Sequence, residues 1–166
     1  MPGMQKGTVV RWQGALGFEA ESEDGARIPL GGESTPAFGP AALMLAALAG
    51  CTGMDAISIM QKKRQRIERY DVEVSGEQLD EHPRAFSRIV VDHIIEGQGV
   101  DDVAVARAIE LSARKYCVVG ATIAAGDTVI QHRFRITDES GQRTGDCATV
   151  GPHRAGLAVP EAVSPS

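Results

Sequence analysis

Three cysteines are the residues of this chain whose chemistry is most distinctive. Cys51, Cys117 and Cys147 form no CxxC pair, and an odd number of cysteines is unlike the paired framework of a small secreted protein. We therefore expect a cytoplasmic protein in which the resting thiols are reduced and any disulfide is transient. Taken alone, each cysteine would more often be a small buried apolar residue, because free cysteine is among the most buried residue types.

Cys51 lies in the middle of a long apolar stretch, residues 36–66. No charged residue occurs between positions 41 and 50, and the apolar positions run around the whole helical circumference. Such a helix must be surrounded by protein or by lipid. A membrane span needs roughly 20 apolar residues, whereas this run is interrupted by Gly50 and Asp55. The stretch therefore predicts a buried central helix that carries a thiol, and not a membrane span.

Composition and motifs argue against several other function classes. The net charge of −5 makes nucleic acid an unlikely partner, and the basic run at 62–66 is interpreted as a solvated helix end. The four histidines and three cysteines show no pair at helical ligand spacing, so we expect no metal site. A GxSxG motif and a Gly-rich phosphate-binding loop are both missing from the sequence.

The hydrophobic pattern predicts an α+β fold of the order β-β-β-α-β-β-α-β, with antiparallel sheets against the central helix. The expected elements are three strands within 5–30, a helix from 40 to about 66, strands at 70–75 and 86–96, a helix capped by Asp101, and a strand at 129–136. In the second helix, an inner face is predicted for Val105, Ala108, Ile109, Ser112 and Tyr116.

In the last predicted strand, His132 shares a face with isoleucines and should point inward. Gly, Pro, Ser and charged residues dominate from Thr137 onward. We therefore predict a single domain over residues 1–137 and a flexible C-terminal tail over 138–166. Cys147 lies in that tail and is interpreted as incidental.

Three segments resemble the OsmC/Ohr superfamily, in particular its OsmC-like, YhfA-type branch. They are GPAALMLAALAGCTGMDAISIMQKKRQ, EHPRAFSRIVVDHIIEGQGV and AIELSARKYCVVGATI. The resemblance covers about residues 5–137, and the two cysteine segments with the HPRAF strand between them are specific as a set. It implies an intertwined homodimer, with antiparallel sheets wrapped around two buried central helices and active sites at the subunit interface.

The resemblance also implies a function. Family members reduce organic hydroperoxides and peroxide with two cysteines, and here Cys51 matches the peroxidatic cysteine and Cys117 the resolving one. A thiolate attacks the O–O bond and becomes a sulfenic acid, which a second thiol condenses to a disulfide. The implied partners are a small hydroperoxide and a dithiol reductant, either a lipoyl group or a small thiol. No metal, organic cofactor, nucleic acid or membrane is implied.

Two departures from the family pattern keep other functions open. Relatives of the Ohr type carry a glutamate ten residues before the cysteine, where this chain has Ala41, and WQGALGF lacks their hairpin arginine. Arg11, Arg27 or an arginine of the partner chain is a candidate substitute for that arginine, and Glu33 for the glutamate. The alternatives are a non-catalytic member that binds a small apolar ligand at the dimer interface, or a thiol redox sensor.

Asp55 bears on the same question. It follows Cys51 by one helical turn, and its negative charge would oppose formation of a thiolate unless the carboxylate is paired. The partner of the Asp55 carboxylate therefore bears directly on the reactivity of Cys51.

Overall fold

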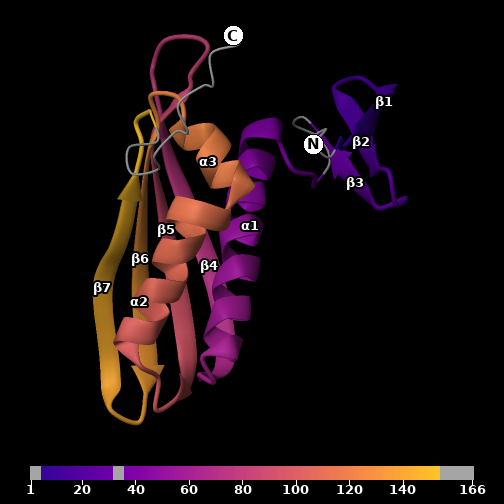
Figure 1. The fold of residues 1–166 in the computed structure, drawn as a ribbon. Helices are drawn as coiled ribbons and strands as arrows, with labels where there is room; N and C mark the ends of the chain where they lie inside the picture. The colour runs from indigo at the N-terminus through magenta and orange to yellow at the C-terminus, as the bar shows by residue number, and fades with distance from the viewer. Residues whose placement is uncertain (1–4, 32–35, 154–166) are drawn as a thin grey trace, which may run out of the picture. The chain divides into compact units, whose positions relative to one another are not determined.

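The computed structural model describes residues 5–31 and 36–153, which divide into two compact units (Figure 1). The first unit is residues 1–44 and the second is residues 45–166. Helix α1 (Pro40–Lys62) begins in the first unit and continues into the second. The α+β class predicted from the sequence is confirmed.

The first unit contains the three-stranded antiparallel sheet expected within residues 5–30. Its strands are β1 (Thr8–Gly14), β2 (Gly17–Ser22) and β3 (Arg27–Leu30), in that order. The β2–β3 turn needs a glycine, because Gly25 has a positive φ of 86°. A proline at the first helical position starts α1 without the loss of a backbone hydrogen bond, as predicted.

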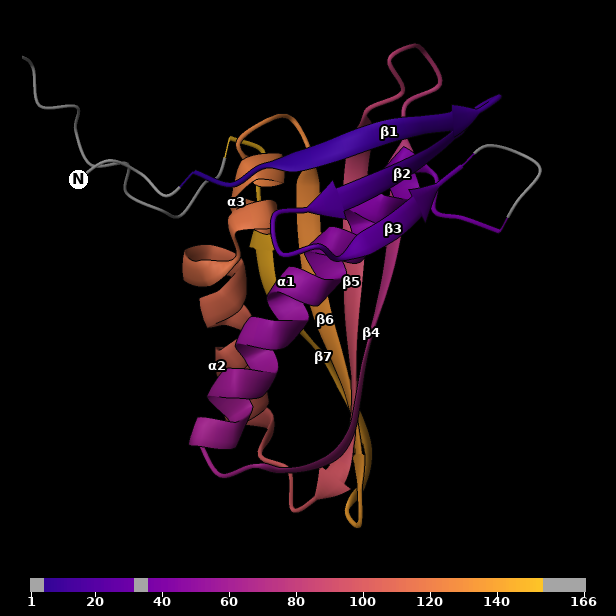
Figure 2. The ribbon, with the colours of Figure 1, turned by 90° about the vertical axis from the view of Figure 1, so that its right-hand side faces the viewer.

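The second unit is a four-stranded sheet with helices α2 and α3 over one face (Figures 1 and 2). The strand order is β4-β5-β6-β7. The elements after α1 are β4 (Arg66–Gln78), β5 (Phe86–Gln98), α2 (Asp102–Leu111), a π-helical turn (Ser112–Tyr116), α3 (Val118–Ala124), β6 (Val129–Asp138) and β7 (Gly141–Val150).

The sheet is mixed, which corrects the expectation of purely antiparallel sheets. Strands β4 and β5 form an antiparallel hairpin, but β5 pairs with β6 in parallel from Arg88↔Val129 to Glu96↔Thr137. The chain between β5 and β6 crosses the sheet through α2 and α3, and such a crossover returns the chain in the same direction. Pattern alone does not determine strand direction, since both pairings alternate their side chains in the same way.

The predicted flexible tail is wrong for the part of it that the structure describes. Residues 141–150 form β7, which pairs with β6 from Ile130↔Val150 to Asp138↔Gly141. This edge strand is largely polar because one side faces solvent, so its inward residues Ala148 and Val150 give only a weak signal. Residues 154–166 of the predicted tail lie outside the described residues.

The inner face of α2 agrees with the prediction up to the π-helical turn. Ala108, Ile109 and Ser112 are buried, and the Asp101 carboxylate caps the helix by accepting a hydrogen bond from the Val103 N–H at 2.9 Å. Tyr116, predicted to share that face, is 52% exposed. A π-helical turn holds more residues than an α-helical turn, so it rotates later side chains off the helical face.

The part of α1 that lies in the second unit packs one of its sides into the two apolar clusters of that unit. Its fully buried side chains include Leu48, Thr52, Ala56 and Met60, whereas Met54 is 72% exposed. Among the described helices, α1 alone is long and apolar enough to cross a membrane. The core helix of a folded protein meets the same criterion, and Gly53 packs closely on β4, where an added Cβ would lie 3.2 Å from Val72 Cγ2.

Candidate functional site

Cys51 and Cys117 lie in the same apolar cluster of the second unit. Cys117 is buried within the cluster, and Cys51, half-buried in the middle of α1, packs against it. The surrounding side chains are aliphatic or aromatic, among them Leu48, Phe86 and Ile89. Residues 66 positions apart in the sequence are therefore brought to one place by the packing of α1 against the segment between α2 and α3.

Cys117 occupies a position that the local backbone defines closely. It ends the π-helical turn, and its extended conformation makes it the N-cap of α3. Its sulfur accepts a hydrogen bond from the Gly120 N–H at 3.2 Å. A Cβ at Gly120 would lie 3.3 Å from the Cys117 sulfur and 3.4 Å from Leu48 Cδ1. The absence of a side chain at Gly120 thus leaves the room in which the sulfur sits.

The surroundings of Cys117 keep it protonated. The pKa of Cys117 is raised to about 12, chiefly by burial and next by the neighbouring Cys51 thiol. The Gly120 N–H opposes this shift, because a hydrogen bond to sulfur favours the thiolate. Cys117 is therefore a thiol at neutral pH.

Polar groups link α1 to the π-helical turn beside the cysteines. Ser112 Oγ lies 2.9 Å from Asp55 Oδ2 and 3.1 Å from Thr52 Oγ1. Ser112 and Thr52 are fully buried and Asp55 is half-buried. In the part of the chain that the structure describes, the Asp55 carboxylate is paired with this hydroxyl and not with a cation. The sequence predicts an inner position for Ser112, but it does not identify the partners of this side chain.

Cys147 is not in a loose tail, and its environment differs from the one expected. It lies on β7, half-buried, and packs against both apolar clusters of the second unit. Burial, followed by the negative charges of Asp146 and Glu110, raises the pKa of Cys147 to about 12. Like Cys117, it is a protonated thiol at neutral pH.

Comparison with known families and proteins bears on this site. Residues 31–133 match the model of the OsmC-like protein family. The chain is also 40% identical to Protein YhfA of Escherichia coli strain K12 over 111 residues, which are 66% of this chain and 83% of that protein. The chain belongs to the OsmC-like family. The match includes both Cys51 and Cys117.

Solved structures with the OsmC fold agree. The OsmC-like protein of Mycoplasma pneumoniae superposes with a TM-score of 0.71 at 16% identity, covering 80% of this chain and 97% of that one. An organic hydroperoxide resistance protein from Elizabethkingia anophelis superposes with a TM-score of 0.58 at 14% identity, covering 84% of this chain and all of that one. These likenesses show a shared fold.

The two departures from the Ohr-type pattern remain in the structure. Ala41 is an exposed residue in the first turn of α1. Arg11 and Arg27, the candidate substitutes for the hairpin arginine, both pair with Glu21 on the first unit's sheet, at 2.7 and 3.3 Å. Glu33, the candidate acid, lies outside the described residues.

A second polar group in the core lies among β4, β5 and β6. Tyr70 Oη is 2.6 Å from His93 Nδ1, and His93 Nε2 is 3.2 Å from His132 Nδ1. His132 points inward as predicted, but it is not the one inward histidine within the described residues, because His93 is also fully buried. His93 shares a face of β5 with Val91 and Ile95, the same period-2 signal that identifies His132. Burial lowers the pKa of His93 to about 3, with His132 adding to the shift, and burial lowers the pKa of His132 to about 4. Both imidazoles are neutral at physiological pH.

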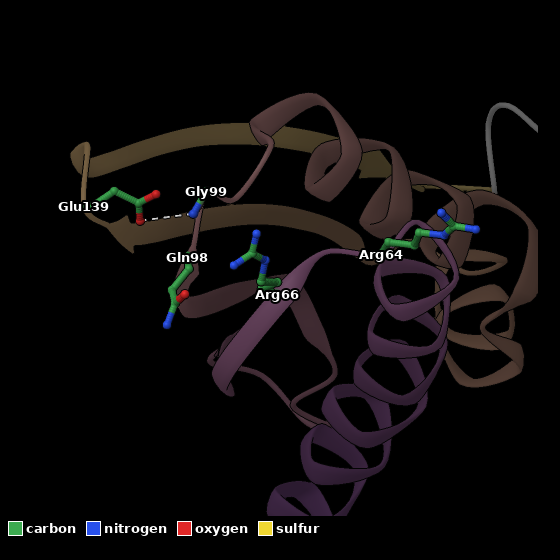
Figure 3. Close-up of a pocket in the computed structure, with 5 residues that line it drawn as sticks. All are labelled: Arg64, Arg66, Gln98, Gly99 and Glu139. Atoms are coloured by element: carbon green, nitrogen blue, oxygen red, sulfur yellow. Dashed lines mark hydrogen bonds between the residues drawn. The ribbon is translucent and has the colours of Figure 1, made fainter.

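Neither histidine forms part of a metal centre. Within residues 5–31 and 36–153, no three or more His, Cys, Asp or Glu side chains are arranged to hold a metal ion. A polar hollow of about 450 Å³ lies instead beyond the end of α1, lined by Arg64, Arg66, Gln98, Gly99 and Glu139 (Figure 3). There the Gly99 N–H donates to Glu139 at 3.0 Å, and Arg64 points away from the other four residues. At 1.5 Å per residue, the end of α1 is about 16 Å from Cys51, so this hollow is separate from the thiols.

Proposed function

We propose that this protein is a cysteine-based hydroperoxide reductase of the cytoplasm. In this proposal Cys51 attacks the O–O bond of an organic hydroperoxide, an alcohol leaves, and Cys51 becomes a sulfenic acid. Cys117 then condenses with the sulfenic acid, and a dithiol or small-thiol reductant restores both thiols. The observation that supports it best is the packing of Cys51 against the apolar cluster that contains Cys117.

The lining of the site supports an organic substrate over the smaller hydrogen peroxide. Leu45, Leu48 and Val119 belong to the same cluster as the two cysteines. Aliphatic walls favour the alkyl or aryl part of a hydroperoxide through loss of apolar surface to water. Some structural relatives are named organic hydroperoxide resistance proteins, which is consistent with this substrate class.

A homodimer is part of the proposal. Met54 and Val118 are 72% and 68% exposed in the single chain, although they flank the two cysteines in the sequence. Apolar side chains exposed on an apolar helix are typical of a surface that a partner covers. A second copy would complete the wall of the site and exclude water from it.

One alternative is supported by specific observations. Ala41 replaces the Ohr-type glutamate, both candidate arginines are paired with Glu21, and Cys117 is held as a thiol. These features favour a non-catalytic family member that binds a small apolar molecule. A thiol redox sensor would share the first oxidation step but would not turn over.

Turnover distinguishes these functions. The reduced protein is mixed with dihydrolipoamide and cumene hydroperoxide, and the loss of the hydroperoxide is followed with time. The same assay with hydrogen peroxide gives the rate for the smaller substrate. We expect catalytic loss of the organic hydroperoxide, abolished by Cys51→Ser, whereas Cys117→Ser leaves Cys51 prone to over-oxidation. Cys147→Ser is the matched control and should retain turnover. The proposal would be overturned if the Cys51→Ser variant still turned over the hydroperoxide, or if the unaltered protein showed no turnover.

A further inference from the structure

Asp55 is a half-buried carboxylate beside the two cysteines that has no role in the proposed function as stated above. It follows Cys51 by four residues on α1, and residues at this spacing lie on one helix face with their Cβ atoms about 5–6 Å apart. In the described part of the chain it has no lysine or arginine partner. A carboxylate kept near a redox cysteine without a cation opposes thiolate formation, so its presence requires another explanation.

Ser112 connects Asp55 to Cys117. The Ser112 hydroxyl lies 2.9 Å from Asp55 Oδ2, and the Ser112 carbonyl accepts the Cys117 backbone N–H at 2.9 Å. The π-helical turn between them is a rare element that is frequent at functional sites. One residue thus holds both the carboxylate and the backbone of the cysteine, and Cys117 in turn packs in the cluster that contacts Cys51.

The resolving step has a chemical requirement that concerns Asp55. With its pKa raised to about 12, chiefly by burial, Cys117 is almost entirely a neutral thiol at pH 7. Only a thiolate attacks a sulfenic sulfur at a useful rate. A base must therefore take the Cys117 proton as the new bond forms. Asp55 is close enough for its charge to contribute to the raised pKa of the Cys117 thiol.

We propose that Asp55 is the general base of the disulfide-forming step, held toward Cys117 by the Ser112 hydroxyl. The Cys117 sulfur attacks the sulfur of the Cys51 sulfenic acid, and the S–O bond breaks as the S–S bond forms. Asp55 accepts the Cys117 proton and passes it to the departing hydroxide, so one water is released. Cys117 is oxidised and the Cys51 sulfur is reduced, with the hydroperoxide as the original oxidant. This inference rests on the proposed function.

The test separates the oxidation of Cys51 from the formation of the disulfide. Reduced protein is mixed with one equivalent of cumene hydroperoxide and quenched at intervals with dimedone, and mass spectrometry counts Cys51 adducts and Cys51–Cys117 crosslinks. In Asp55→Asn, we expect Cys51 to be oxidised at least as fast as in the unaltered protein, while the crosslink forms roughly 10²-fold more slowly, as is typical of losing a general base. The trapped sulfenic acid should accumulate.

The pH profile distinguishes a base from a merely structural residue. In the unaltered protein, the crosslinking rate should be level between about pH 6 and 8, where the base pathway exceeds the free-thiolate pathway. In Asp55→Asn it should rise about tenfold per pH unit, because free thiolate alone then reacts. Ser112→Ala keeps the carboxylate and should keep the level profile, and Asp55→Glu should recover most of the rate. The pH profile of the crosslinking rate in the unaltered protein is itself a test, and it does not depend on whether any variant folds.

Three results would overturn the inference. They are an unaltered crosslinking rate in Asp55→Asn, a rate in the unaltered protein that already climbs about tenfold per pH unit between about pH 6 and 8, and a Ser112→Ala profile identical to that of Asp55→Asn. In all three, Cys51 is still oxidised, so the proposed function stands. Failure of the proposed function looks different, since Cys51 in the unaltered protein would then give no dimedone adduct and no crosslink.

Discussion

At the scale of single residues, Cys51 and Cys117 are a pair with different environments. Cys51 is half-buried in the middle of α1. Cys117 is buried, its sulfur accepts a hydrogen bond from the Gly120 N–H, and its raised pKa keeps it a thiol. An attacking cysteine needs access to substrate, and a resolving cysteine needs only access to its partner. The difference in exposure agrees with the roles that the family resemblance implies for these residues.

The histidine pair gives a prediction about acid stability. His93 and His132 have pKa values of about 3 and 4 in the folded chain, against about 6.5 in an unfolded one, so the unfolded state binds more protons below neutrality. The free energy of unfolding should be fully retained above about pH 7.5 and should fall as the pH drops through 6.5 toward 4. At pH 5 the loss is about 2 kcal/mol for each histidine.

Urea unfolding between pH 7.5 and 5 measures this loss, and NMR titration of the two imidazoles assigns it. Tyr70 faces His93 and has its own pKa raised by burial, so it stays neutral throughout. In His82→Gln, which removes an exposed histidine, the pH dependence of the free energy of unfolding should be unchanged. If either buried imidazole titrates near pH 6.5, this explanation of the acid sensitivity is wrong.

At the scale of elements, α1 is apolar on all sides between positions 41 and 50, and the second unit covers one side of the part of the helix that belongs to it. Leu48, Ala56 and Met60 are fully buried, whereas Met54 is exposed, although the sequence between positions 41 and 50 leaves no side of the helix charged. A second copy that covers the open side would explain the composition of the helix. It would also enclose Cys51.

Met54→Lys tests this explanation of α1. A lysine at the centre of an apolar interface loses its hydration without gaining a partner, so we expect the dimer to dissociate at least tenfold more readily. Light scattering should give twice the 17.6 kDa of one chain for the unaltered protein and a lower mass for the variant at the same concentration. Leu79→Lys, at an exposed position after β4, should leave the mass unchanged. A monomeric unaltered protein would contradict the explanation.

Much of the element order is predictable from the sequence, and the exceptions have physical causes. The β1–β2–β3 sheet, α1, the β4–β5 hairpin and the inward His132 follow from periodicity and turn residues. The parallel β5–β6 pair, the edge strand β7 and the π-helical turn do not, because each depends on contacts between segments far apart in the sequence. Likewise the sequence identifies Asp55 as a charge near Cys51, but its partner Ser112 is 57 residues away.

At the scale of the whole molecule, the fold is that of the OsmC-like family, and the chemistry depends on two segments that it brings together. The match to the family covers both cysteines, while the glutamate and arginine of Ohr-type relatives have no counterpart at the same positions. If the proposed function holds, a family member with the cysteines but without those two residues activates its thiols by other means. In our proposal, Asp55 activates Cys117 by accepting its proton in the disulfide-forming step.

The most direct test of the proposed redox pair is a thiol count with peptide mapping, before and after one equivalent of cumene hydroperoxide. We predict loss of two thiols, a Cys51–Cys117 crosslinked peptide and an unmodified Cys147. Survival of both Cys51 and Cys117 in millimolar hydroperoxide would contradict the proposal, and would favour a family member that binds an apolar ligand without redox chemistry.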